Sequence, residues 1–255
     1  MKKTPLIYVD HGSPMRILED NPINDRLSFI GKSLEEKDIK AILIISAHWI
    51  TNGSFITTSN DLETIHDFYG FREDLYELNY PAKTSVFLID EIKKILPFVK
   101  EDSTYGLDHG AWTVLKKLFP DSQIPVVQLS IDSTLSGKDY FEIGKKLSIL
   151  REKGVLIIGS GSIVHNLRDF SWEENIIYPW ARDFDQKIKK SILENDFKTI
   201  VNYENIENYK KSVPSFDHFV PLLYILGATS EGEKLIYDYE NISNGSLTNN
   251  IIITK

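Results

Sequence analysis

Short apolar runs alternate along this chain with longer stretches in which apolar residues recur every three or four positions. A run that is apolar at almost every position is typical of a strand buried on both faces. This pattern, or a shorter version of it, predicts strands at Leu6–Asp10, Ala41–Ser46, Ser54–Thr58, Val126–Ile131 and Val155–Ile158. The wider spacing predicts helices at Arg26–Glu36, Ser85–Leu96, Gly110–Phe119, Gly137–Lys153 and Ile176–Asn195, and a further helix that begins near His218. Strands that alternate with helices indicate an α/β protein with a mixed central sheet and helices on both faces.

Two turn signals and one long connection complete the pattern. The segments Lys234–Asn241 and Ser246–Thr254 flank Asn244-Gly245, which is a strong signal for a hairpin. A polar and aromatic connection runs from Ser59 to Thr84. Connections of this length in compact domains are usually functional or disordered, and the many Phe and Tyr residues of this one argue against disorder. Because the chain has no repeat and no linker rich in Gly or Ser, we expect residues 1–255 to form a single domain.

Composition narrows the classes of partner and of metal ligand. The 255 residues are 42% apolar and 26% charged, as in an ordinary soluble globular protein. The net charge of −8 comes without clusters of Lys and Arg, which argues against nucleic acid or an anionic membrane as the partner. Cysteine is absent, so any metal has to be held by imidazole and oxygen. The first apolar run is too short for a signal peptide and no run reaches the ~18 apolar residues of a membrane span, so a cytoplasmic protein is expected.

Three histidines follow three predicted buried strands. His11 comes after Leu6–Asp10, His48 after Ala41–Ser46 and His165 after Val155–Ile158. In an open α/β sheet, ligands bind beyond the carboxyl ends of the strands. Taken alone, each histidine is more often a partly buried residue that hydrogen-bonds to backbone. Together they predict a metal site at one edge of the sheet.

Other motifs give weaker signals. An Asp precedes each of His11, His109 and His218, and a carboxylate often accepts the second N–H of a metal-bound imidazole, although sequence neighbours need not fill that role. No HExxH motif is present. The segment Gly159–Ser162 follows a strand but matches neither a phosphate-binding loop nor the GxSxG motif of serine hydrolases.

Seven motifs, in their order along the chain, resemble the DOPA 4,5-extradiol dioxygenase family, which belongs to the class III extradiol (LigB-like) superfamily. The matching blocks run from residue 11 to residue 228, which is nearly the whole chain. They are HGSPM (His11–Met15), SAHW (Ser46–Trp49), IHDFYGF (Ile65–Phe71), YPA (Tyr80–Ala82), YGLDHGAW (Tyr105–Trp112), GSGSIVHNL (Gly159–Leu167) and DHFVPLLYILGA (Asp217–Ala228).

The resemblance implies a single-domain LigB-like fold of the phosphorylase/hydrolase-like type, with a non-haem metal near the strand ends. His11, His48 and His218 match the metal-binding positions of the family. His165 matches the catalytic acid/base position and is a possible fourth ligand, and His109 matches a further active-site position near the substrate.

Three further residues are expected to bind substrate, namely Ser13 and, from the long aromatic connection, His66 and Tyr69. The chain also departs from the pattern of that superfamily, in which a Glu often occupies the third ligand position, where this chain has His218. Fe2+ is the expected cofactor, and Zn2+ is the alternative because imidazole-rich sites suit both ions. Arg16 stands where relatives often have an apolar residue.

The resemblance implies an enzyme that opens the ring of a catechol with O2, so its partners are a small aromatic diol and O2. In this reaction, His165 is expected to accept a proton from the diol and later to return one. A zinc-dependent hydrolase that uses the same site is a second hypothesis. A non-enzymatic LigB-like protein-binding module is a third, because fold does not determine function. The chain is expected to be a monomer or a small homo-oligomer.

Overall fold

The computed structural model describes residues 3–255 except residues 36, 122 and 174. Within these residues, eight strands form one mixed sheet. In spatial order they are β6 (Lys100–Asp102), β3 (Phe55–Thr57), β7 (Val126–Asp132), β2 (Ala41–Thr51), β8 (Val155–Gly161), β1 (Leu6–Asp10), β12 (Ile251–Thr254) and β9 (Leu235–Tyr239). The four central strands β7, β2, β8 and β1 are parallel, whereas β12 and β9 add antiparallel neighbours at one side.

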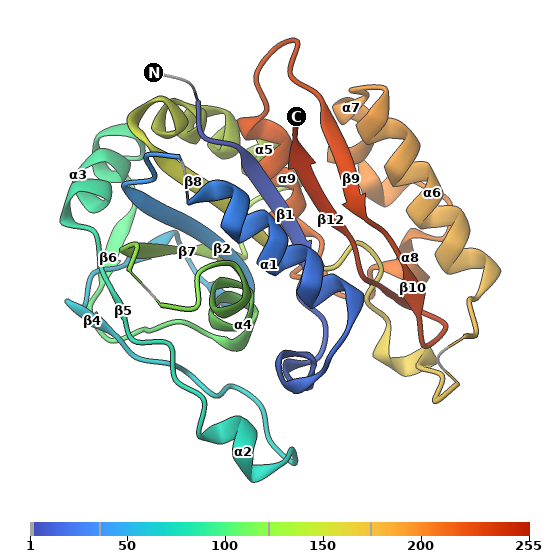
Figure 1. Cartoon of the computed structure of the whole chain (residues 1–255). Coiled ribbons are helices and arrows are strands. Elements are labelled where there is room, and N and C mark those ends of the chain that lie inside the picture. The colour runs from blue at the N-terminus through green and yellow to red at the C-terminus, as the bar shows by residue number, and fades with distance from the viewer. Residues whose placement is uncertain (1–2, 36, 122, 174) are drawn as a thin grey trace.

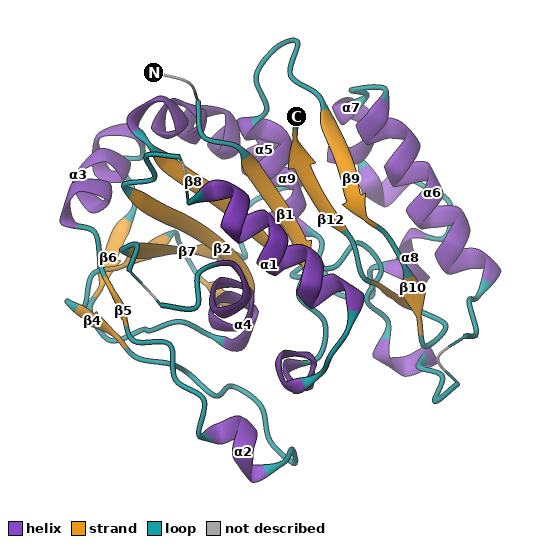
Figure 2. Ribbon diagram, in the orientation of Figure 1, coloured by secondary structure: helices purple, strands orange, loops and turns teal. Residues whose placement is uncertain are grey.

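Helices cover both faces of the sheet, as Figure 2 shows by colour. The longer helices are α1 (Pro22–Leu34), α3 (Val86–Ile95), α4 (His109–Leu118), α5 (Gly137–Leu147), α6 (Pro179–Leu193) and α9 (Val220–Ala228). The shorter ones are α2 (Glu73–Tyr76), α7 (Phe197–Val201), α8 (Tyr209–Ser212) and the 3-10 segments η1 (Pro14–Leu18), η2 (Ser148–Lys153), η3 (Leu167–Asp169) and η4 (Tyr203–Asn205). The predicted mixed sheet with helices on both faces is confirmed.

Alternate residues of the central strands enter two apolar cores. Leu43 and Ile157 pack against the side of α3, α5, α6 and α9, whereas Ile44 and Ile158 pack against α1 and α4. This two-sided burial explains why the central strands are apolar at nearly every position. Among the described helices, none is both long and apolar enough to cross a membrane.

Several predicted boundaries are wrong. Helix α6 begins at Pro179 rather than Ile176, because a proline is favoured in the first turn of a helix. Helix α1 begins at Pro22 behind the cap Asn21, well before Arg26, and the predicted end at Glu36 lies outside the described residues. The segment Gly137–Lys153 is an α-helix only to Leu147 and continues as η2.

Strand β2 is the boundary that matters for the site. It continues past Ser46 to Thr51, and its register with β7 shifts between Ile45 and Ile50. His48 therefore lies inside the irregular end of a strand and not beyond it.

The predicted hairpin is confirmed. Strand β9 pairs with β12, and closer to the turn β10 (Ile242–Ser243) pairs with β11 (Leu247–Thr248). Asn244 and Gly245 both have positive φ, 53° and 80°, as an Asn-Gly turn favours. Because Ser243 pairs with Leu247, the turn holds three residues rather than the two that the signal predicts.

The connection of residues 59–84, which we name the arm, is ordered. Its two ends pair as β4 (Asp61–Leu62) and β5 (Ala82–Lys83). Helix α2 lies near its tip, away from the sheet at the lower edge of Figure 1. Leu62, Leu75 and Tyr80 are buried in the core that α1 and α4 share, so the arm is packed as its aromatic content predicts.

Candidate metal centre

Five histidine rings gather where the central parallel strands end, and we name them the imidazole cluster. His11 directly follows β1, His48 lies in the irregular end of β2, and His165 follows β8. His109 is the first residue of α4, and His218 lies in the turn before α9. The cluster thus combines the parallel strand ends with the starts of two helices.

Three of these rings face one another closely enough to share an ion. His11, His48 and His218 each offer a ring nitrogen, and these three atoms lie within 4.8 Å of one another. The Nε2 atoms of His11 and His48 are 3.0 Å apart. The ring centroids are 4.9 Å apart for His11 and His48, 5.3 Å for His11 and His218, and 5.0 Å for His48 and His218. The structure therefore brings together the three residues predicted as ligands.

Neighbouring groups direct two of these rings inward. Ser160 Oγ donates to the carbonyl of Gly110, so its oxygen is left to accept from Nδ1 of His11 at 3.0 Å. Asp217 Oδ1 accepts from Nδ1 of His218 at 2.9 Å. In both residues Nδ1 carries the proton, so Nε2 is the nitrogen with a lone pair for a metal. Metal-binding histidines are usually held by such a second bond.

Burial favours the neutral form of these rings. Desolvation, reinforced by the neighbouring imidazoles, lowers the pKa of His48 to about 2 and that of His11 well below its ordinary value. Desolvation and His218 lower the pKa of His165 to about 3. A neutral imidazole is the form that binds a metal. The donor set and its protonation therefore fit a divalent cation such as Fe2+ or Zn2+.

His165 lies beside the three-nitrogen group. Its ring is stacked on that of His218, with centroids 3.7 Å apart and an interplanar angle of 4°. Its backbone N–H donates to the carbonyl of Ser212. This position next to a candidate ligand is compatible with either of its predicted roles, acid/base or fourth ligand.

His109 is the fifth ring of the cluster, and the sequence does not predict its partner, Asp67. Asp67 Oδ1, from the arm, accepts from the backbone N–H of His109 at 2.8 Å and from its Nδ1 at 3.0 Å. The other oxygen of Asp67 lies 3.5 Å from Nδ1 of His48. Burial opposes ionisation of Asp67, but the bonds from His109 lower its pKa below the ordinary value.

Only one of the three Asp-His pairs is a contact between their side chains. Asp217 bonds to His218, as described above. The Asp10 carboxylate instead accepts hydrogen bonds from the backbone N–H groups of Ile163 and Asn250. The first of these bonds holds the loop after β8 in place. The Asp108 carboxylate caps α4, and it accepts from Ser46 and Gln128.

The three residues predicted to bind substrate lie outside the imidazole cluster. The imidazole of His66 is bonded through Nε2 to the carbonyl of Leu78, and its ring packs against Trp112. Tyr69 is 92% exposed. Ser13 caps η1 and lines a narrow crevice that also borders His11.

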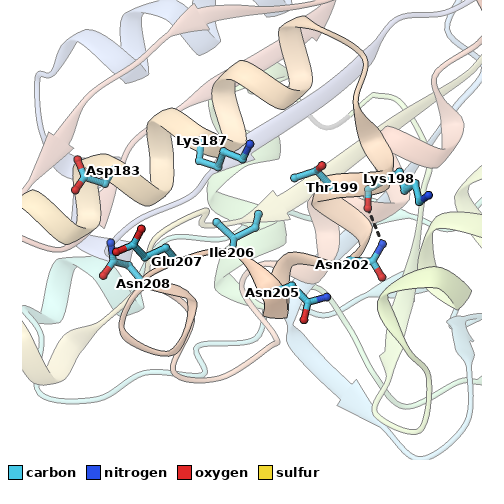
Figure 3. Close-up of a pocket in the computed structure, with 9 residues that line it drawn as sticks. All are labelled: Asp183, Lys187, Lys198, Thr199, Asn202, Asn205, Ile206, Glu207 and Asn208. Atoms are coloured by element: carbon cyan, nitrogen blue, oxygen red, sulfur yellow. Dashed lines mark hydrogen bonds between the residues drawn. The ribbon is translucent and has the colours of Figure 1, made fainter.

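A surface cavity of about 740 Å³ lies between α6 and the segment that follows it, and its lining residues are drawn in Figure 3. Asp183 and Lys187 of α6 form one wall, and seven residues between Lys198 and Asn208 form the other. None of the histidines lines it. Its wall is mixed in charge, with ammonium, carboxylate and amide groups, so size alone does not make it the reaction site.

Comparison with known proteins agrees with the geometry. Residues 4–248 match the family described as the catalytic LigB subunit of aromatic ring-opening dioxygenase. The chain is 39% identical to a 4,5-DOPA dioxygenase extradiol of Escherichia coli (strain K12), over 96% of this chain and 93% of the relative. It is 36% identical to the 4,5-DOPA dioxygenase extradiol of Beta vulgaris, over 89% of this chain and 87% of the relative.

A solved structure has the same fold. The crystal structure of an uncharacterized protein from Escherichia coli K12 aligns with a TM-score of 0.86 at 36% identity, and the alignment covers 98% of this chain and 99% of that one. The predicted LigB-like resemblance is therefore confirmed. The chain belongs to the LigB family of aromatic ring-opening dioxygenases and is a ring-cleaving dioxygenase.

Proposed function

We propose that this enzyme opens the ring of a catechol of the DOPA type with O2, at one divalent metal ion held by His11, His48 and His218. One observation carries the proposal: three imidazole nitrogens from three separate elements converge within 4.8 Å. The names of the relatives point to a diol substrate. We further propose that residues 1–255 act as a single catalytic domain, and that the enzyme is cytoplasmic and a monomer or small homo-oligomer.

The donor set suits either predicted ion. When bound, a divalent cation lowers the pKa of a catechol hydroxyl, and Fe2+ also supports reaction with O2. Zn2+ accepts the same ligands but has no redox chemistry. We therefore propose Fe2+ as the metal of the active enzyme, with Zn2+ as the alternative occupant.

The remaining histidines handle protons and orientation. His165 lies against His218, so its imidazole is next to the site where a diol would bind and can accept one hydroxyl proton. His109 is within 4.0 Å of His48 and 5.5 Å of His11, measured between ring centroids. We propose that Nε2 of His109 hydrogen-bonds to the substrate or to O2.

Phe68 is the aromatic residue of the arm that we propose to face the substrate ring. Its ring meets the edge of His109 at a centroid distance of 5.7 Å, whereas Tyr69 is exposed to solvent. Ser13 stays a candidate because it shares a crevice with His11. His66 and Tyr69 stay candidates only if the arm moves when substrate binds.

The direct test is reconstitution of the purified protein with Fe2+ under anaerobic conditions, followed by a panel of DOPA, caffeate and protocatechuate under air. Ring opening consumes O2 and gives a product that absorbs at longer wavelength than the catechol. A protein that binds Fe2+ but leaves every catechol intact would contradict the proposal. Full activity on an ester or amide with Zn2+, with no uptake of O2, would select the hydrolase hypothesis instead.

A further inference from the structure

Asp67 is a carboxylate of the site that the proposed function does not use. It belongs to the arm, whereas its partners belong to α4 and β2. Its side chain is 23% exposed, so the carboxylate is partly covered, whereas the residue as a whole, with its backbone, is exposed. A partly desolvated carboxylate that touches two active-site imidazoles is a candidate for a role in the reaction.

The bonds of Asp67 determine the protonation of one ring. An ionised carboxylate only accepts hydrogen bonds, so Nδ1 of His109 must carry the proton in the 3.0 Å contact. In the neutral ring Nε2 is then an acceptor, and it points away from Asp67. The second bond, from the backbone N–H of His109, restrains the same carboxylate from another direction. Together the two bonds hold the ring in one tautomer and one orientation.

The arm is anchored closely on both sides of Asp67. Leu107 donates to the carbonyl of Glu63 and accepts from the N–H of Ile65, so the chain before Asp67 runs alongside the segment that leads into α4. The indole of Trp112 donates to the carbonyl of Ile65 at 3.0 Å. Next to Asp67, the ring of Phe68 packs on His109. These contacts place the carboxylate before any substrate arrives.

Within the same site, a second carboxylate makes the same arrangement. Asp217 Oδ1 accepts from the backbone N–H of His218 at 2.7 Å and from its Nδ1 at 2.9 Å. The matching values for Asp67 and His109 are 2.8 Å and 3.0 Å. This geometry leaves Nε2 of His218 among the three candidate metal donors. By the same geometry, Nε2 of His109 is left available to a bound molecule.

We propose that Asp67 is a positioning residue, which holds His109 as the Nδ1-protonated tautomer so that Nε2 accepts a hydrogen bond from the substrate. The contact with His48 is the weaker one, because 3.5 Å exceeds the length of a good hydrogen bond. The inference rests on the proposed function of the same site. Its distinctive consequence is that Asp67 acts through His109 rather than through the metal.

The first measurement needs neither metal nor substrate. Nitrogen-15 spectra of the histidine rings report the tautomer of His109 in the native protein, in Asp67→Ala and in Asp67→Asn. We expect one Nδ1-protonated form in the native protein, a mixture of tautomers in Asp67→Ala, and retention of the native tautomer in Asp67→Asn, whose amide oxygen still accepts. Asp61→Asn is the control, because Asp61 is an exposed carboxylate of the same arm that bonds to Lys83. An unchanged His109 tautomer in Asp67→Ala would overturn the proposal.

The second measurement is a double-mutant cycle on turnover, combined with calorimetric titration of Zn2+. Asp67→Ala is expected to lower kcat by about 10- to 100-fold, as loss of a partner behind an active-site histidine typically does. In a His109→Asn background the same substitution should cost less than about 2-fold, because the residue through which it acts is gone. Equal losses in the two backgrounds would contradict the proposal. Should the native protein open no catechol, or His109→Asn be too slow to follow, the tautomer measurement still decides the role of Asp67.

Discussion

Two carboxylates hold two histidines of this site in the same way, but the chain supplies them differently. Asp217 directly precedes His218 in the turn before α9. Asp67 is 42 positions from His109 and reaches it only because the arm folds back over the start of α4. One pair is therefore built by local backbone geometry, whereas the other depends on tertiary packing.

The difference divides the site into a part that persists and a part that depends on the arm. His11 and His218 take their orientation from Ser160 and Asp217, which belong to the sheet and to the turn before α9. His48 and His109 both face Asp67. A displacement of the arm would leave the first pair intact and loosen the second. Because the contact of Asp67 with the proposed ligand His48 is 3.5 Å long, whereas its bond to His109 is 3.0 Å, turnover should depend on the arm more than metal binding does.

The largest effect should come from removal of a metal ligand in either part. His48→Ala and His218→Ala are each expected to abolish tight metal binding, with a loss beyond the ~100-fold that an outer partner typically costs. Metal analysis after dialysis against free ion measures this directly. His66→Ala is the matched control, because that imidazole bonds to the carbonyl of Leu78 outside the cluster. Normal metal content in either ligand variant would break the assignment of His11, His48 and His218 as one centre.

Removal of His165 should lower turnover nearly as much as removal of a metal ligand does, but without loss of the metal. We expect His165→Ala to keep its metal and to lose about 10²- to 10⁴-fold in kcat, the usual contribution of an acid/base group. Parallel measurements of metal content and O2 uptake separate the two roles. Loss of metal equal to that of His48→Ala would make His165 a fourth ligand instead.

The sequence predicts the local features of this site better than the tertiary ones. Leu6–Asp10 is a strand buried on both faces, so its end and His11 could be located from apolar pattern alone. Gly154, at a φ of 85°, ends η2 as a glycine is expected to do. The sequence predicts the end of β2 at Ser46, which is too early, because the strand continues through His48 to Thr51 across a register shift against β7.

Asp67 shows why the tertiary contacts of the site could not be predicted from the sequence. The sequence indicates Asp10, Asp108 and Asp217, because each precedes a histidine. In the structure, however, Asp10 accepts hydrogen bonds from backbone N–H groups, and Asp108 accepts them from a hydroxyl and an amide side chain. Which carboxylate meets His109 is decided by how the arm packs, and no local spacing encodes that. The one available signal was a charged residue within the aromatic motif IHDFYGF of an ordered connection.

The two orienting carboxylates should differ in which property they support. Asp217→Ala is expected to lower the affinity for Zn2+ by about 10- to 100-fold, because it frees the ring of a ligand. Asp67→Ala should lower that affinity by less than about 10-fold, the smallest loss expected for the partner of a ligand. Its bond to His109 lies outside the three-nitrogen group, and its contact with the ligand His48 is as long as 3.5 Å. Calorimetric titration of both variants, with Asp61→Asn alongside, gives the comparison. Equal losses of affinity would mean that the two parts of the site are not distinct.

The smallest expected effect is a difference in KM between substitutions of two neighbouring arm residues, Phe68 and Tyr69. Phe68 packs edge-on against His109. Its proposed contact with the ring of the substrate is a second aromatic pair, and such a pair is worth about 0.5–1.5 kcal/mol, or roughly 2- to 13-fold in affinity. Phe68→Ala should therefore raise KM by a factor in this range. Tyr69→Ala should change KM by less than about 2-fold, because Tyr69 is 92% exposed and a surface side chain typically contributes within about 0.5 kcal/mol. Steady-state kinetics on the same catechol measures both. A larger effect of Tyr69→Ala would mean that the arm closes over the substrate, so that the exposed side of the arm, and not Phe68, forms the wall of the site.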